Sequence, residues 1–112
     1  MKAKKEGKPL TIVGDGLQSR DFTHVSDVVN ANILAMKSDQ VGAGDVVNIG
    51  YGKNITVLDL AKIIGGDLVY EPERQEAKHS LADITKTKRL LGWEPKVGIE
   101  EGLKDLMKHF GL

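Results

Sequence analysis

Residues 14–27 have the sequence GDGLQSRDFTHVSD, and this stretch organises the first third of the chain. The apolar run Leu10–Val13 before it predicts a short strand that stops at the glycines of the GDG turn. Phe22–Val25 predicts a second extended segment. Asp27 is then expected to cap a helix that continues to Lys37 and carries a wide apolar stripe. The stretch therefore predicts a strand, a turn, an extended segment and a helix in that order.

The rest of the chain continues with short elements that glycines repeatedly interrupt. Residues 46–49 are rich in β-branched side chains and predict a strand, and residues 68–70 predict another. Thr56, with an acidic residue three positions later, forms a capping box for a helix. Helices are also expected at residues 85–91 and 99–110. The sequence therefore predicts the α/β class, as a small mixed α+β domain with short strands, about four helices and no complete Rossmann sheet.

The composition describes one globular domain without net charge. Among 112 residues, 16 Lys and Arg balance 16 Asp and Glu, so no overall field attracts nucleic acid or a membrane. The absence of cysteine excludes disulfides and thiolate metal sites and favours a cytoplasmic location. No apolar run approaches the roughly 20 residues of a membrane span. Residues 1–7 form a basic lead-in without the apolar core of a signal peptide, which leaves residues 8–112 as the domain.

No set of residues for bond-breaking chemistry is complete in this sequence. The G-x-G-x-x-G fingerprint of a dinucleotide-binding turn is absent, and so is a Y-x-x-x-K pair. The three histidines are far apart and lack metal-ligand spacing. His79 and Ser80 are adjacent in sequence, which does not make a catalytic triad. We therefore expect no catalytic residue, no cofactor-binding residue and no metal ligand in this chain.

Arg20 and Arg74 are the candidate ligand contacts. A planar guanidinium binds phosphate oxygens through paired hydrogen bonds. Arg20 follows the glycine turn, and Arg74 lies in a predicted loop beside Pro72. The alternative for Arg20 is a surface ion pair with Asp15 or Asp21, and Arg74 has the same kind of alternative. The residues alone leave both interpretations open.

Residues 14–27 resemble the G-D-G-x-Q-x-R-D-F/Y-x-H/Y-V-x-D stretch of nucleotide-sugar epimerases and dehydratases, which are extended short-chain dehydrogenases/reductases. Further similar segments follow in the family's order, namely DVV-A at 27–31, VNIG-G at 47–52, TV-DLA at 56–61, KHSLADI at 78–84, LLGWEP at 90–95 and IEEGL at 99–103. Together the resemblance covers about residues 8–112. In this family the matched region belongs to the substrate-binding domain, while an N-terminal Rossmann domain carries NAD and the catalytic groups.

The resemblance implies binding roles for five residues. The family's arginine in R-D-F/Y contacts the substrate diphosphate and matches Arg20. A second arginine and an acidic residue, in P-x-R-x-G-D/E, contact the diphosphate and the ribose, but this chain has PERQE there and lacks the glycine. Either one residue is deleted, which leaves Arg74 and Glu76 in these roles, or Arg74 is displaced; the retained P-x-R spacing favours the deletion. The strand positions that line the family's nucleobase pocket match Thr11 and Val13, with Val13 as a plain core residue being the alternative.

The sequence is thus interpreted as the C-terminal substrate-binding region of a UDP-glucose 4-epimerase-like protein. The resemblance implies a UDP-sugar or another nucleotide sugar as ligand, no cofactor in this chain, and no catalysis by this chain alone. The expected partner is a separate Rossmann half or a second copy, because the apolar stripe between Val28 and Met36 is wider than one small domain covers. The alternatives are a stand-alone binding or interaction module and a degenerate structural remnant.

Overall fold

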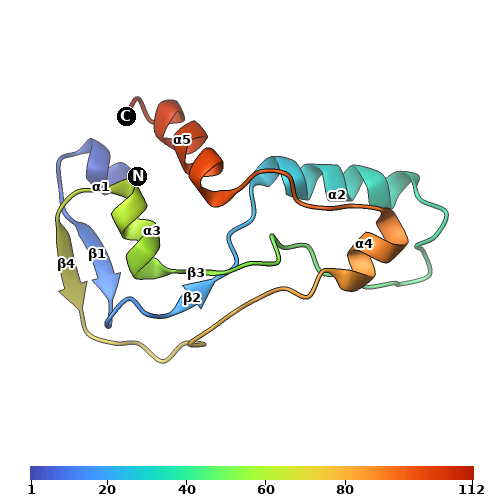
Figure 1. Cartoon of the computed structure of the whole chain (residues 1–112), viewed down its shortest axis with the longest axis horizontal. Coiled ribbons are helices and arrows are strands. Elements are labelled where there is room, and N and C mark those ends of the chain that lie inside the picture. Colours follow the sequence, from blue (N-terminus) through green and yellow to red (C-terminus); the bar gives the residue numbers. More distant parts are fainter. The chain divides into compact units, whose positions relative to one another are not determined.

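The computed structural model describes residues 1–112, which form two compact units. Unit 1 comprises Met1–Arg20, Ile55–Ser80 and Glu100–Leu112, and unit 2 comprises Asp21–Asn54 and Leu81–Ile99. Five helices and four short strands make up the chain (Figure 1). The predicted mixed α/β class without a complete Rossmann sheet is confirmed. The assignment of residues 8–112 to a single domain stays a prediction. No helix has the length and apolar character needed to cross a membrane.

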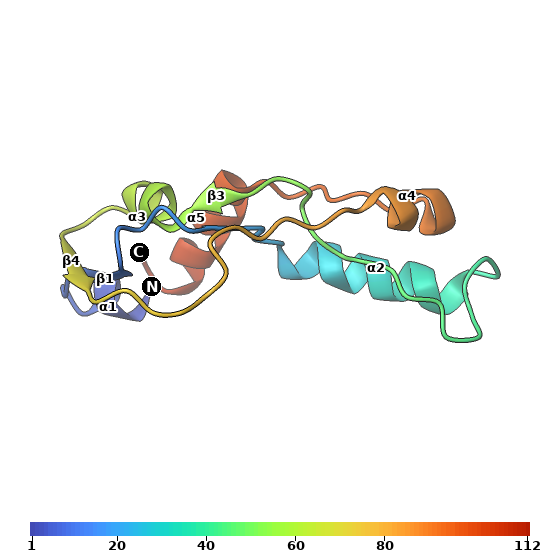
Figure 2. The same cartoon turned by 90° about the horizontal axis from the view of Figure 1, so that it is seen from below.

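Unit 1 is built on two small sheets. β1 (Leu10–Val13) and β4 (Leu68–Glu71) pair in parallel, and both predicted strands are confirmed. β2 (Ser19–Arg20) and β3 (Ile55–Thr56) pair in antiparallel fashion. Because parallel strands end at the same edge of a sheet, the turn after β1 and the segment after β4 start side by side (Figures 1 and 2).

Helix α3 (Val57–Ile64) begins with the predicted capping box. The Thr56 hydroxyl accepts a hydrogen bond from the Asp59 backbone N–H at 3.0 Å and donates one to the Asp59 carboxylate at 2.8 Å. The hydrogen bond from Thr56, followed by that from Lys62, lowers the pKa of Asp59. This carboxylate therefore stabilises the folded chain above its ordinary pKa, and the contribution is lost as the pH falls through the lowered value. The helix ends at Gly65, whose positive φ of 75° favours glycine.

Two further helices complete unit 1, namely the short α1 (Lys2–Lys5) and nearly all of α5 (Ile99–His109). The latter confirms the predicted C-terminal helix. The buried apolar residues of this unit are Ile12 on β1, Ala61 on α3 and Leu103 on α5. Since α3 contacts β1 directly, the buried face of β1 is the one that carries Ile12. The opposite face of β1 remains accessible.

Unit 2 packs α2 (Val25–Lys37) against α4 (Thr85–Leu91). Its apolar cluster consists of the buried residues Ala31, Ile84 and Trp93, with Ile49, Ala82 and Leu91 packed around them. The predicted helix at 85–91 is confirmed, and it ends at Gly92 in the left-handed conformation with a φ of 60°. This cluster is small, and hydrogen bonds to the carboxylates of Asp27 and Asp21 join further segments of the unit.

Asp27 is the buried polar centre of unit 2. Its exposed fraction is 1%. Oδ1 accepts a hydrogen bond from the Lys96 N–H and Oδ2 accepts one from the Val97 N–H, both at 3.0 Å. The Asp27 backbone carbonyl accepts a third from the Trp93 indole N–H at 3.0 Å. One residue therefore ties the first turn of α2 to the segment that follows α4.

Asp21 organises a second turn of unit 2. Its Oδ1 accepts a hydrogen bond from the Tyr51 N–H at 2.7 Å, and its Oδ2 accepts from the Gly52 N–H at 2.9 Å and the Ala82 N–H at 3.3 Å. Gly50 has no room for a side chain, because a Cβ there would lie 2.7 Å from the Asp21 Oδ2. The carboxylate thus gathers two distant segments around a glycine-dependent turn.

The extended segment predicted at Phe22–Val25 does not form a strand, and the predicted helix cap is wrong. The strand forms at Ser19–Arg20 rather than at Phe22–Val25, because β3 pairs with the former and Val25 already opens α2. The N-cap is His24, whose ring accepts the Ser26 N–H at 3.3 Å. Asp27 lies inside the first turn instead, where distant backbone N–H groups use its carboxylate.

The strand predicted at residues 46–49 is also wrong. β-branched residues favour extended backbone, but a strand needs a partner, and none pairs with this segment. Side chains of α4 take the place of a neighbouring strand. The Val46 carbonyl accepts a hydrogen bond from the Lys86 Nζ at 2.8 Å, and the Asn48 carbonyl accepts one from the Thr87 hydroxyl.

We expect Asp27→Ala to lower the free energy of unfolding by about 1–3 kcal/mol, because it removes a buried carboxylate that accepts hydrogen bonds from two partly buried backbone N–H groups. Urea denaturation followed by the fluorescence of Trp93 measures this loss. The matched control is Asp67→Ala, an exposed residue whose replacement should change the stability by less than about 0.5 kcal/mol. Equal stabilities of Asp27→Ala and the control would contradict the structural role of this carboxylate.

Candidate functional site

Thr11 and Val13 occupy the accessible face of the β1–β4 sheet. Side chains alternate along a strand, and residues opposite each other in a parallel pair share a face. Thr11 lies opposite Val69, and Val13 lies opposite Glu71. Thr11 is exposed and Val13 is half-buried, so Val13 is not part of the buried core. The two predicted base-pocket positions therefore lie together on a surface that a ligand can reach.

The turn between β1 and β2 has a fixed geometry. Gly16 has a φ of 74°, and a Cβ there would lie 2.8 Å from the Ile12 side chain, so only glycine fits. The Asp15 carboxylate accepts the backbone N–H two residues ahead at 2.9 Å. The Gln18 side chain donates back to the Val13 carbonyl at 3.0 Å. These contacts direct the chain from the end of β1 into β2.

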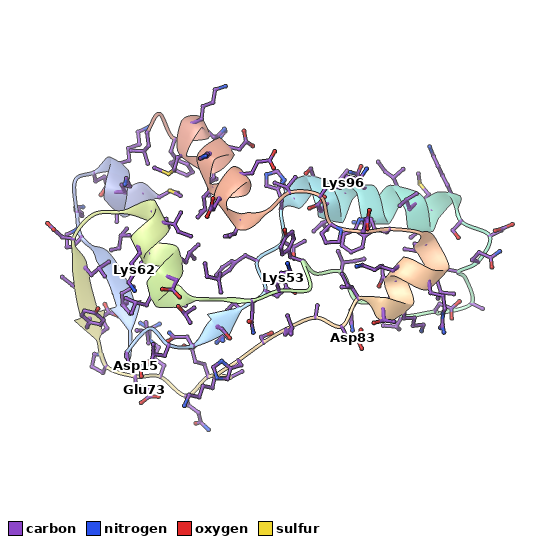
Figure 3. The ribbon with its side chains drawn as sticks, viewed as in Figure 1. Asp15, Lys53, Lys62, Glu73, Asp83 and Lys96 are labelled. Carbon is purple, nitrogen blue, oxygen red and sulfur yellow. The ribbon has the colours of Figure 1, made fainter.

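The loop after β4 lies against this turn. The Gly14 N–H donates to the Glu71 carbonyl at 2.9 Å, and a Cβ on Gly14 would lie 3.6 Å from the Glu73 Cβ. Figure 3 shows Asp15 and Glu73 on these two neighbouring loops. The edge where β1 and β4 end therefore brings the glycine turn and the PERQE segment into one place.

Arg20 is anchored on one side and paired on the other. Its Nη1 donates to the Ser19 carbonyl at 2.8 Å, and its Nη2 donates to the Glu76 Oε2 at 3.1 Å. The Arg20 side chain is 27% exposed, and that of Glu76 is 42% exposed. The alternative ion pairs with Asp15 or Asp21 do not form. The structure therefore brings two of the predicted site residues together.

Arg74 is not drawn into this pair. Its side chain is 69% exposed, and its Nη2 donates to the Glu71 Oε2 at 3.0 Å. This is the surface ion pair that the sequence left open as the alternative for Arg74. Arg74 therefore lies in the same segment as Glu76, but it pairs with Glu71, whereas Arg20 pairs with Glu76.

Sequence reasoning missed the contact between Ser19 and His79. The Ser19 side chain is buried, and its Oγ lies 2.8 Å from the His79 Nδ1. Their separation of 60 positions leaves no local pattern that predicts the contact.

The site offers cations and hydrogen-bond acceptors rather than reactive groups. Each of two guanidinium groups pairs with an exposed carboxylate, Arg20 with Glu76 and Arg74 with Glu71, which is chemistry suited to a diphosphate and to hydroxyls. No group of three or more His, Asp or Glu residues is arranged to hold a metal ion. The arrangement therefore supports binding of an anionic, hydroxyl-bearing ligand.

Comparison with known proteins identifies the family. Residues 1–106 match the family model described as GDP-mannose 4,6 dehydratase. The chain belongs to this family. The resemblance carried by residues 14–27 is thereby confirmed, and the relatives are UDP-sugar epimerases and decarboxylases of the NAD-dependent extended short-chain dehydrogenase/reductase class.

Three relatives define how much of the family fold this chain covers. UDP-glucuronic acid decarboxylase 2 of Arabidopsis thaliana is 38% identical over 110 residues, which are 92% of this chain and 24% of the decarboxylase. The UDP-glucose 4-epimerase of Thermotoga maritima, solved with UDP-glucose, has a TM-score of 0.89 at 41% identity and covers 97% of this chain. The UDP-glucuronic acid 4-epimerase of Bacillus cereus, solved with UDP-glucuronic acid and NAD, has a TM-score of 0.86 at 33% identity and covers 98%. This chain spans 37% of each solved epimerase.

Proposed function

We propose that unit 1 binds the diphosphate of a UDP-sugar through Arg20. The observation that carries this proposal is how the Arg20 guanidinium is held. Its Nη1 donates to the Ser19 carbonyl, which orients the group, and its Nη2 donates to the exposed carboxylate of Glu76. An exposed ion pair contributes at most about 1 kcal/mol, so an anionic ligand displaces the carboxylate at small cost. A diphosphate offers several oxygens in the geometry that a guanidinium prefers. Arg20 is therefore preorganised for such a ligand.

The other predicted residues take complementary roles around the diphosphate. Arg74 supplies the second cation after leaving its carboxylate partner, and Thr11 with Val13 borders the nucleobase on the accessible sheet face. Glu76, once released from Arg20, accepts a hydrogen bond from a ribose hydroxyl. The presence of UDP-glucose and UDP-glucuronic acid in the two solved epimerases supports a UDP-sugar as the ligand class.

NAD does not fit the residues of this chain. In a dinucleotide-binding fold, a glycine turn after a parallel strand opens a helix whose N-terminus faces the pyrophosphate. Here the turn after β1 leads into β2, and β4 is followed by an exposed segment rather than by a helix. We therefore assign the cofactor and the catalytic groups to a Rossmann domain outside these 112 residues, so that the 112 residues alone are not a competent epimerase.

UDP should bind the isolated chain weakly and shift the backbone NMR signals of Thr11, Val13 and Arg20 at millimolar concentration. Each charge-assisted contact is worth roughly 1.5–3 kcal/mol, so Arg20→Ala and Arg74→Ala should each weaken binding about ten- to a hundredfold. Titration of the 15N-labelled chain measures the dissociation constants.

The matched control is Arg89→Ala, which removes the third arginine of the sequence from α4 in unit 2 and should leave the UDP affinity unchanged. Uridine without phosphates should bind more weakly than UDP. An absence of shifts with the wild-type chain at millimolar UDP would contradict the proposed function and favour a structural remnant. Unchanged affinity of Arg20→Ala would contradict the role of that residue alone.

The purified 112-residue chain should neither bind NAD tightly nor epimerise UDP-glucose. The physical reason is that no glycine turn at the end of β1 or β4 opens a helix, and that no Y-x-x-x-K pair supplies a proton-transfer group. NMR of the sugar protons detects the product directly. Expression in a host without its own epimerase is the control, and turnover by that preparation would refute this part of the proposal.

The exposed stripe on α2 supports a contact with a further domain or with a second copy of this chain. Val25, Val29, Ile33 and Met36 lie on one face of the helix with exposed fractions of 69%, 49%, 40% and 77%. Contiguous apolar surface of this kind usually marks an interaction site. We assign it to a partner half when one is present and to a second copy of this chain otherwise.

Sedimentation at several concentrations should therefore show self-association of the isolated chain above its mass of 12.2 kDa. The double variant Val29→Glu, Met36→Glu should shift the equilibrium toward the monomer, because two charges would be buried in the contact. The control Leu112→Glu changes an exposed apolar residue outside the stripe. A wild-type chain that stays monomeric up to millimolar concentration would rule out the pairing.

A further inference from the structure

The segment that carries Arg74 and Glu76 has little packing to define its position. Residues 71–80 are exposed along their whole length. Apolar burial therefore cannot fix where Glu76 lies, and an exposed segment of this length loses substantial conformational entropy when it is ordered. Specific hydrogen bonds must determine its position relative to β2.

Those hydrogen bonds converge on Ser19. The Ser19 N–H donates to the Lys78 carbonyl at 2.9 Å, and the Ser80 N–H donates to the Ser19 carbonyl at 3.0 Å, which forms a parallel bridge between Ser19 and His79. The side chains add a third contact, Ser19 Oγ to His79 Nδ1 at 2.8 Å. Ser19 has an exposed fraction of 5%, so these bonds are shielded from competing water on its side.

We propose that His79 is a positioning residue that fixes Glu76 opposite Arg20, a role that rests on the proposed function. Arg20 directly follows Ser19, and Glu76 precedes His79 by three residues, so one anchor sets the distance between both members of the ion pair. The Ser19 carbonyl completes the arrangement, because it also accepts from the Arg20 guanidinium at 2.8 Å. His79 therefore acts on the ligand through Arg20 and Glu76.

The contact requires a polar atom at the δ position of residue 79. Ser19 and the Nδ1 of His79 can exchange donor and acceptor roles with the tautomer of the ring. Asparagine places its amide oxygen and nitrogen at the same distance along the side chain, whereas glutamine places them one bond further away. His79→Asn should therefore retain the side-chain contact with Ser19, and His79→Ala and His79→Gln should lose it while the two backbone hydrogen bonds remain.

The experiment compares His79→Ala, His79→Gln, His79→Asn and Ser19→Ala in the full chain. UDP affinity should fall about three- to tenfold in the three variants without the contact, because UDP must then itself order the exposed segment that carries Arg74 and Glu76, and the affinity should recover in His79→Asn. Adding His79→Ala to Ser19→Ala should weaken binding no further, because both remove the same contact. Urea denaturation should show that the variants remain folded. An unchanged UDP affinity in folded His79→Ala would overturn the proposal.

A second readout needs no ligand and separates this inference from the proposed function. NMR of the Arg20 Nη–H groups should show faster rotation of the guanidinium in His79→Ala than in wild type, because Glu76 is no longer fixed opposite it. The Arg74 signals are the internal control, since its partner Glu71 lies in β4. If the wild-type chain does not bind UDP, the proposed function alone is refuted. If the Arg20 guanidinium rotates equally fast in His79→Ala and in wild type, the positioning role is refuted.

Discussion

The buried carboxylate of Asp27 is the interaction on which unit 2 depends. At an exposed fraction of 1% it has almost no contact with water, so its two oxygens depend on the hydrogen bonds from the Lys96 and Val97 N–H groups. The carbonyl of the same residue orients the Trp93 indole, which belongs to the small apolar cluster of this unit. The hydrogen bonds of Asp27 and the apolar packing of Trp93 therefore lie next to each other. Neither can form fully without the other, which couples α2 to the segment after α4.

The neighbouring residues Arg20 and Asp21 show how one dipeptide serves two different purposes. Asp21 uses its oxygens on three backbone N–H groups around the glycine turn of unit 2. A carboxylate engaged in this way does not compete for the adjacent guanidinium. Arg20 consequently pairs with Glu76, which comes from the exposed segment after β4. Asp21 therefore has a structural role, and the partner of Arg20 is a residue that lies far from it in the sequence.

Features that depend on a single turn of chain could be predicted from the sequence. The capping box at Thr56 and the glycine ends of α3 and α4 are examples, since a few neighbouring residues determine them. The strand at 46–49 could not, because extended propensity does not reveal whether a partner strand exists. In the site, family resemblance led to Arg20 and Glu76, but their contact with each other is a long-range result of folding. The pair of Ser19 and His79 is likewise invisible in local sequence.

The candidate site relies on polar anchors rather than on packing, and this determines how it responds to a ligand. Its side chains are half-buried or exposed, and both arginines already form ion pairs, Arg20 with Glu76 and Arg74 with Glu71. A diphosphate therefore replaces existing ion pairs, so the net gain per contact is smaller than the gross attraction. Part of that gain also orders the exposed segment after β4. Any group that orders the segment in advance raises the apparent affinity without touching the ligand, and the hydrogen bonds that converge on Ser19 are such groups.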